Sequence, residues 1–275
     1  MYVLGITGDA PADALSQTVD RVVARLERAG RVGIVRYDAT IADGTASVSE
    51  GGPRGGDVTY ELGADGDWAA TGTGLTVADA IDDLATTCEY AVVVGVDGLR
   101  HPQIVLGTPI ETAVEPLAVL EDPRDLDVET ALEALHGREP YETLGSLVDR
   151  VTSAPEAERA GAIATFTGRV RAKESSDDVR TTHLEFETYD GVADERLSVI
   201  ETDLAARDGV FGVELHHRTG VVRDGEDIVF VVILAGHRRE AFRAVEDGID
   251  RLKDEVPLFK KEVTVDDEFW AHDRS

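Results

Sequence analysis

Apolar residues in the first half of the chain alternate between continuous runs, typical of buried strands, and a three-to-four-residue repeat, typical of helices. An apolar run covers residues 2–6, a helical repeat covers 15–26, and a second apolar run follows at 32–35. Another helix is predicted over 76–87, directly before an apolar run at 90–96. Because helices separate the strands, we predict an α/β first domain.

Turn-forming residues interrupt this pattern twice. Residues 40–74 are rich in Gly, Ala, Ser, Thr and Asp, so we predict loops there with one short strand at 58–62. A charged stretch containing Pro123 then ends the first domain. The predicted division is residues 1–122 for the first domain, 123–140 for a linker with a short helix at 128–135, and 141–275 for the second domain.

The second half mixes strands and helices without strict alternation, which predicts an α+β domain. The predicted strands lie at 161–168, 184–188, 213–218 and 228–234, and the predicted helices at 144–151, 193–206 and 239–255. In the last helix we expect Phe242, Val245, Ile249 and Leu252 to form one apolar stripe, and Pro257 follows its end.

The net charge of the chain excludes some classes of binding partner. The chain has 275 residues with 55 acidic and 27 basic side chains, a formal net charge of −28. Such a charge repels phosphate backbones and anionic lipid surfaces, so we expect no nucleic-acid or membrane partner. The longest apolar runs are far shorter than the ~20 residues of a membrane helix, and the first residues show no basic stretch followed by an apolar segment. We therefore expect a cytoplasmic protein.

Lysine is nearly absent. The only lysines are Lys173, Lys253, Lys260 and Lys261, and the other 23 basic residues are arginines. An acidic chain with so little lysine is typical of salt-loving organisms, whose concentrated salt screens carboxylate repulsion. Three lysines within nine positions then need a local reason, and chemistry is one such reason.

The first domain begins with a strand, the sequence Gly5-Ile6-Thr7-Gly8 and a helix, which is the setting of a phosphate-binding loop. A nucleotide-binding P-loop also needs Gly, Lys and Ser/Thr where this chain has Ala10, Pro11 and Ala12. The order of elements, with Gly98-Leu99-Arg100-His101-Pro102-Gln103-Ile104-Val105 after a strand, resembles the MobB family over roughly residues 1–110. Since the motif is eroded, we favour a structural or docking relic over nucleotide hydrolysis.

Two further features favour structural roles. The single cysteine, Cys88, could carry a persulfide, but no neighbouring cation would lower the pKa of its thiol, so we favour a packed small hydrophobe. His216 and His217 are adjacent on a predicted strand and therefore face opposite sides, which favours one buried and one exposed imidazole over a shared metal. We expect no metal and no cofactor.

Cations gather differently in the second half. Arg169 and Arg171 share one side of an extended segment, and Lys253 falls beside Ile249 at the border of the apolar stripe. The remaining cations are His237 and Arg238 at a strand-to-helix junction, and Lys260 and Lys261, which an extended segment places on opposite sides. Surface cations at a helix C-terminus are the structural alternative. In a chain so poor in lysine, we favour a binding site.

Five motifs now carry a family resemblance. They are Thr165-Phe-Thr-Gly168-Arg169-Val-Arg171, His216-His217-Arg218-Thr-Gly220, Gly236-His237-Arg238-Arg-Glu-Ala-Phe242, Asp250-Arg-Leu-Lys253 and Val256-Pro257-Leu-Phe259-Lys260-Lys261-Glu262. In this order, over roughly residues 141–270, they resemble the large, catalytic subunit of molybdopterin synthase, the MoaE family. The family's frequent tryptophan before its second lysine is Phe259 here.

The resemblance implies an α/β hammerhead-type fold and a homodimer that carries a small ubiquitin-like sulfur-carrier subunit at each end. It also implies an activity. Two sulfur atoms pass from the carrier's C-terminal glycine thiocarboxylate to cyclic pyranopterin monophosphate and form the dithiolene of molybdopterin. Both substrates are anionic, so a local group of cations matches them. No metal is needed at this step.

By carry-over onto matching positions, the resemblance assigns a substrate site to Arg169, Val170, Arg171, His237, Arg238, Lys253, Lys260, Lys261 and Glu262. Lys253 would be the principal catalytic residue and Lys260 its partner. Lys253 could serve in proton transfer or as an amine held against the carrier's terminal carbonyl, and the sequence leaves both roles open. The rival hypothesis is a non-catalytic scaffold for cofactor-assembly proteins.

Overall fold

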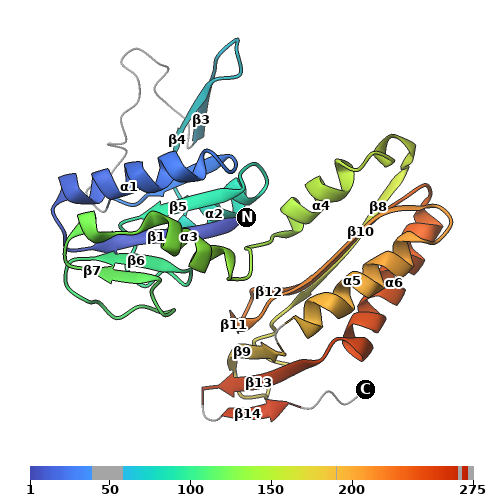
Figure 1. Ribbon diagram of the computed structural model, residues 1–275. Helices are drawn as coiled ribbons and strands as arrows, with labels where there is room; N and C mark the ends of the chain where they lie inside the picture. Colours follow the sequence, from blue (N-terminus) through green and yellow to red (C-terminus); the bar gives the residue numbers. More distant parts are fainter. Residues whose placement is uncertain (39–57, 190, 266–267, 272–275) are drawn as a thin grey trace. The chain divides into compact units, whose positions relative to one another are not determined.

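The computed structural model describes residues 1–38, 58–189, 191–265 and 268–271 (Figure 1). The chain divides into two compact units, Met1–Thr143 and Leu144–Ser275. The loop predicted at 40–74 lies partly outside the described residues, whereas the strand predicted at 58–62 is present.

Unit 1 is built on a five-stranded parallel sheet, which confirms the α/β prediction. The strand order is β2-β5-β1-β6-β7, and every neighbouring pair is parallel. Its strands are β1 (Tyr2–Gly8), β2 (Val32–Arg36), β5 (Tyr90–Val94), β6 (Gln103–Leu106) and β7 (Ala118–Leu120). A separate hairpin pairs β3 (Val58–Leu62) with β4 (Trp68–Gly72).

Helices cover both faces of this sheet because side chains along a buried parallel strand alternate between them. On one face, Leu4 and Ile6 of β1 share a core with α1 (Ala12–Leu26) and α3 (Val128–His136). On the other face, Val3 packs in a smaller core with α2 (Val77–Ala85). A capping box at Thr76 begins α2, where its hydroxyl accepts from the Asp79 N–H.

The linker predicted at 123–140 is wrong. The 3-10 turn η1 (Pro123–Asp125) and α3 belong to unit 1, and Leu126, Leu132 and Leu135 are buried in its larger core. The guanidinium of Arg21 on α1 also donates to the backbone oxygen of Leu126 at 2.8 Å. A charged stretch with a proline resembles a linker in sequence, but the apolar repeat that follows packs against α1.

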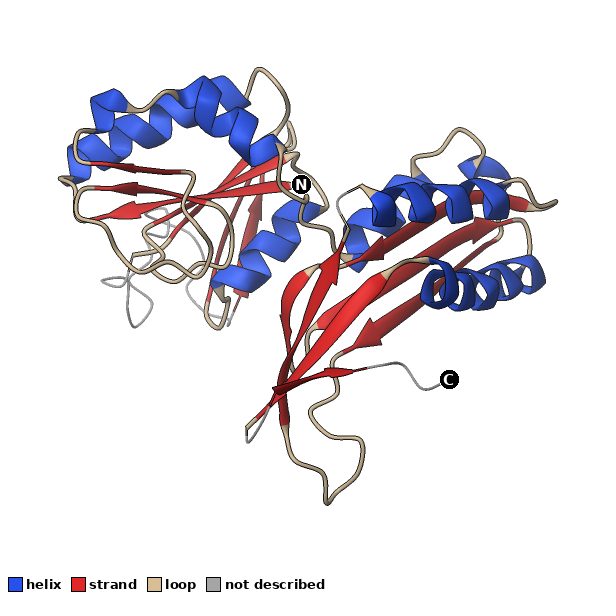
Figure 2. Cartoon of the chain, turned by 60° about the horizontal axis from the view of Figure 1, so that its bottom comes forward, coloured by secondary structure: helices blue, strands red, loops and turns tan. Residues whose placement is uncertain are grey.

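Unit 2 consists of two antiparallel sheets with three helices, as the α+β prediction requires (Figure 2). The first sheet has the order β10-β12-β8 and the second has the order β11-β9-β13-β14. The strands are β8 (Ala162–Arg169), β9 (Thr181–Thr188), β10 (Val210–His217), β11 (Gly220–Arg223), β12 (Asp227–Ala235), β13 (Leu258–Thr264) and β14 (Glu268–Ala271). The 3-10 turn η2 (Ala157–Arg159) precedes β8.

The central strand, β12, is buried on both faces. Val231 and Ile233 face a core shared with α5 (Val192–Ala205) and α6 (Arg238–Glu255). Phe230 and Val232 face the core beneath α4 (Leu144–Thr152). The three-stranded sheet is therefore the middle layer of this unit, and it fixes where α6 begins and ends.

The stripe predicted on α6 is wrong at Phe242, whose side chain is 65% exposed. Ile249 and Leu252 are buried as predicted, and the rest of the buried stripe is formed by Ala241, Ala244 and Gly248. These small residues let the helix approach the sheet closely, and a Cβ added at Gly248 would meet a methyl carbon of Val231 at 3.1 Å. Close packing of small residues leaves no room for a large aromatic side chain.

We expect Leu135→Ala to destabilise unit 1 by about 2–5 kcal/mol, because it opens a cavity in the core. Calorimetric or urea unfolding at one fixed salt concentration measures the change. Glu133→Ala on the exposed face of the same helix is the control and should change the unfolding free energy little. An equally small effect of both variants would restore the linker interpretation.

Candidate active site

The arginine segment, Arg169–Arg171, begins at the last residue of β8. Val170 is buried, and its backbone N–H donates to the Glu226 oxygen at 2.9 Å. Its neighbours Arg169 and Arg171 are both exposed, as expected from alternation along an extended segment. The Arg169 guanidinium lies 2.9 Å from a carboxylate oxygen of Asp227, at the beginning of β12.

The lysine segment is β13, whose antiparallel pairing with β9 sets the direction of each side chain. Lys260 lies directly across from Phe186, and Lys261 lies across from Glu185. Lys260 and Lys261 therefore occupy opposite faces of the sheet, as predicted. Glu262 lies on the same face as Lys260.

Lys261 is held in an acidic environment on the other face. Its Nζ lies 2.8 Å from a carboxylate oxygen of Glu268 and 3.9 Å from one of Glu185. The hydrogen bond that the Lys261 ammonium donates to Glu268 raises the pKa of Lys261. These contacts place Lys261 in an ion-pair cluster on the side of the sheet away from Lys260 and Glu262.

Glu262 has a buried partner that sequence reasoning missed. The hydroxyl of Thr181 donates to its carboxylate, and Thr181 is itself buried at the beginning of β9. The backbone N–H of Thr181 donates at 2.9 Å to the oxygen of Ala172, which follows Arg171. Thr181 thus connects the arginine segment with the lysine segment. Only the pairing of strands that are far apart in the sequence would indicate this link. No local sequence pattern predicts that pairing.

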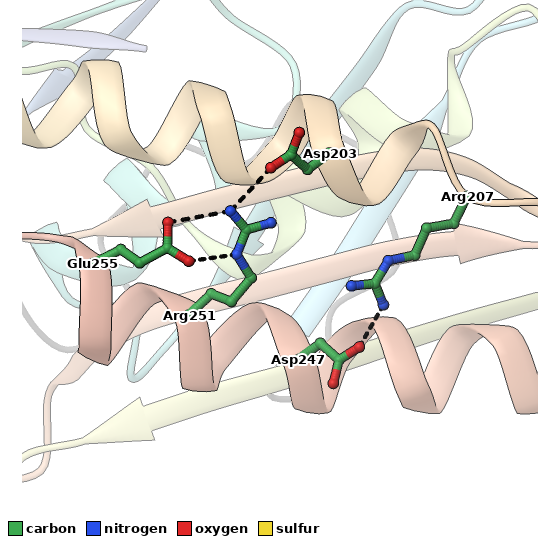
Figure 3. Close-up of polar contacts among 5 residues, drawn as sticks. All are labelled: Asp203, Arg207, Asp247, Arg251 and Glu255. Carbon is green, nitrogen blue, oxygen red and sulfur yellow. Dashed lines mark hydrogen bonds and ion pairs between the residues drawn. The ribbon is translucent and has the colours of Figure 1, made fainter.

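Lys253 is exposed near the end of α6, and ion pairs tie that end to α5 (Figure 3). The Arg251 guanidinium lies 2.6 Å from a Glu255 oxygen and 3.0 Å from an Asp203 oxygen. The hydrogen bonds that Arg251 donates to Glu255 raise the pKa of Arg251. A second pair, Arg207 with Asp247 at 2.5 Å, joins the segment just after α5 to α6.

The structure does not bring all the predicted residues together. His237 is the N-cap of α6, and Arg238 is its first helical residue. Fifteen helical residues from there to Lys253 correspond to about 22 Å at 1.5 Å per residue. Since α6 runs back along β12, Lys253 lies toward the end of that strand where Arg169 pairs with Asp227, and His237 and Arg238 lie at the opposite end.

The two neighbouring histidines differ in burial. His217 is 9% exposed and packs edge-on against Phe186, with 4.7 Å between ring centroids. Burial lowers the pKa of His217 to about 4, so its imidazole is neutral above that pH. His216 is half-buried and stacks near Phe230 on the other face. The prediction of opposite faces is confirmed, whereas the ring predicted to be exposed is half-buried.

In unit 1, a carboxylate lies where the first loop meets α1. Asp9 accepts from the backbone N–H and the hydroxyl of Thr108, both at 2.8 Å. These hydrogen bonds, the backbone one first, lower the pKa of Asp9. A fixed negative charge beside the start of α1 disfavours a phosphate there.

The remaining candidates carry no site. Cys88 is half-buried, with Sγ 3.7 Å from the Thr87 hydroxyl. Among the described residues, no group of three or more His, Cys, Asp or Glu side chains is arranged to hold a metal ion. The described helices include none that is both long and apolar enough to cross a membrane.

Comparison with known proteins identifies the class. The family model described as "MoaE protein" matches residues 141–255. A "Probable molybdopterin synthase" of Haloferax volcanii is 48% identical over 277 residues, which cover all of both chains. A "Molybdopterin synthase catalytic subunit" of Yersinia pestis is 36% identical over 129 residues, 47% of this chain and 84% of its own.

One solved structure concerns the weaker resemblance. A MobB protein homolog from Bacillus stearothermophilus is 16% identical with a TM-score of 0.36, covering 50% of this chain and all of its own. Agreement at that level decides nothing about unit 1.

The relatives define an enzyme of molybdenum cofactor biosynthesis. The chain belongs to the MoaE family, as its five motifs predict.

We expect the free energy of unfolding to fall by up to about 3 kcal/mol between pH 6.5 and pH 4 through His217 alone. The unfolded chain binds a proton near pH 6.5, whereas the folded chain resists it down to about pH 4, so stability rises with pH across this window. Urea unfolding of wild type and His217→Phe at pH 7 and pH 4.5 isolates the effect. Equal pH dependence in the two proteins would contradict it.

Proposed function

We propose that unit 2 transfers sulfur from the thiocarboxylated C-terminus of a small ubiquitin-like carrier to cyclic pyranopterin monophosphate. The observation that supports this proposal most is the gathering of Arg169, Arg171, Lys253 and Lys260 toward one end of unit 2 in a chain of net charge −28. The hammerhead-type fold of the family is part of the same proposal.

The chemistry of each side chain suggests a separate role for it in the transfer. The planar guanidinium groups of Arg169 and Arg171 suit the cyclic phosphate, because arginine binds phosphate oxygens in a bidentate manner. Lys260 would neutralise the carrier's terminal carboxylate, which forms when the oxygen of a water molecule replaces the transferred sulfur. Lys253 is a proton donor or acceptor, or an amine held against the carrier's terminal carbonyl.

Two predicted site residues need a second copy of the chain. His237 and Arg238 are about 22 Å from Lys253 along one α6, which is beyond the reach of one small substrate. A two-fold dimer places the same surface of each copy against the other, so one copy's His237 end can face the other copy's Lys253 end. We therefore propose a homodimer with two composite sites, within a heterotetramer that includes two carriers.

Lys261 has a different role in this proposal. Its side chain faces away from Lys260 and is paired with Glu268 and Glu185. We assign it to holding β13 and β14 together, and so to the shape of the site. The substrate contact implied by the family resemblance would require these ion pairs to break.

For unit 1 we propose a structural or docking role without nucleotide turnover. The position that a phosphate would need is next to the Asp9 carboxylate, which two hydrogen bonds from Thr108 fix in place. Pro11, the N-cap of α1, also lacks the backbone N–H that a phosphate would use.

We expect Lys253→Ala to lower dithiolene formation by about 10²–10⁴-fold, the usual cost of removing a positioned acid–base group. The assay mixes the protein with thiocarboxylated carrier and pterin precursor and measures the product. Fold and carrier binding should persist, because the side chain is exposed. Arg243→Ala, also exposed on α6, is the control and should retain activity. Carrier binding by wild type without any product would favour the scaffold hypothesis instead.

We expect inactive His237→Ala and Lys253→Ala proteins to regain about a quarter of wild-type activity when they are unfolded together and refolded as a mixture. Random exchange makes half of the dimers mixed, and a mixed two-fold dimer has one intact site and one doubly altered site. Each variant refolded alone is the control. No recovery in the mixture, with dimers present, would mean that each site lies within one chain.

A further inference from the structure

His217 is a buried imidazole where the two sheets of unit 2 meet. It is the last residue of β10 and pairs with Val229 near the beginning of β12. Its ring contacts Phe186 of β9, a strand of the other sheet, at an interplanar angle of 78°. The motif His216-His217-Arg218-Thr-Gly220 contains this histidine. The proposed transfer chemistry assigns no role to it.

The hydrogen bond of His217 defines its tautomer. Nδ1 lies 2.8 Å from the backbone oxygen of Arg218. A carbonyl oxygen only accepts, so Nδ1 carries the proton and donates it, and Nε2 keeps a lone pair. This bond fixes the plane of the ring against Phe186. Desolvation keeps the ring neutral at neutral pH.

Phe186 connects His217 to both cationic segments of the site. It lies directly across from Lys260 in the β9–β13 pair, so the two side chains share one face of the sheet. It also forms a small buried cluster with Val222 and with Val170, the residue between Arg169 and Arg171. A shift of the Phe186 ring therefore disturbs both segments.

We propose that His217 is a positioning residue for sulfur transfer: its fixed ring supports Phe186 and thereby sets the position of Lys260 relative to the arginine segment. The inference rests on the proposed function. Edge-to-face ring contacts have a preferred geometry, so the imidazole constrains the phenyl ring more than an aliphatic side chain would. Lys260 is affected most directly, because it is the cross-strand neighbour of Phe186.

Two substitutions separate the ring from its hydrogen bond. His217→Asn keeps a side-chain N–H that can reach the Arg218 oxygen but removes the ring. His217→Phe keeps a ring against Phe186 but removes the donor. His216→Asn is the matched control, because the neighbouring ring faces the other side of the same strand, near Phe230.

We expect kcat of His217→Asn to fall at least about tenfold, because a small displacement of a catalytic group is costly. Its KM for the precursor and its Kd for the carrier should stay within about threefold of wild type. His217→Phe should recover most of kcat, and His216→Asn should match wild type. All assays are run well below each protein's Tm, with the folded fraction checked by circular dichroism.

The outcomes separate the two proposals. Wild-type kcat in His217→Asn, or a fall that only follows a lost folded fraction or lost carrier binding, overturns the role of His217 and leaves the proposed function standing. An equal loss in His217→Phe overturns it as well, because the ring would then not be the part that matters. Absence of product from wild type overturns both proposals.

Discussion

The rest of unit 2 depends on β12, which is paired on both edges and buried on both faces. Its nine residues span about 27 Å as an extended strand, and neighbouring strands and helices leave it no freedom to bend. Two residues separate the end of β12 from the start of α6. The helix packs back along the strand, so the two elements run side by side in opposite directions. Arg169 pairs with Asp227 at the beginning of β12, and His237 lies just past the opposite end of that strand. A single chain therefore cannot close all its site motifs around one small molecule.

A second constraint is electrostatic. Several cations in the described part of unit 2 have carboxylate partners, as Arg251 does on α6 and Arg207 does just after α5. Such pairs fix helices in place but leave little net positive charge to attract an anion. Lys261 is in the same situation through Glu268. Arg169 and Arg171 are paired as well, with Asp227 and Glu174, so an anion bound at the end of β8 would compete with these carboxylates for the guanidinium groups.

The sequence predicts the fold best where periodicity and packing agree. The α/β architecture of unit 1 is predicted correctly. So is the buried stripe of α5 at Leu197, Ile200 and Leu204, because large apolar residues form the pattern. The prediction fails on α6, where small residues make the buried stripe and Phe242 is exposed. The helix predicted at 128–135 is present as α3, but its assignment to a linker is wrong, since composition alone cannot show that an apolar helix after a proline packs onto α1.

The site divides in the same way. Alternation along a strand correctly separates Lys260 from Lys261, and it places Arg169 and Arg171 together, because both follow from local geometry. The contributions of Thr181, Phe186 and His217 depend on which strands pair across the unit. Strand pairing joins residues that are far apart in the chain, so no local pattern in a single sequence predicts it. The separation of His237 from Lys253 is a similar case, because it follows from the direction in which α6 packs.

Salt makes this packing more important. At 1 M salt the Debye length is about 3 Å, so the proposed site would attract an anion only at contact distance. Pairs such as Arg251 with Glu255 at 2.6 Å persist there because they are hydrogen bonds as well as charges. Recognition must then come from donors already held in the correct geometry. In this chain, that geometry depends on buried contacts that salt does not screen: the ring contact of His217 with Phe186 and the hydrogen bond of Thr181 to Glu262.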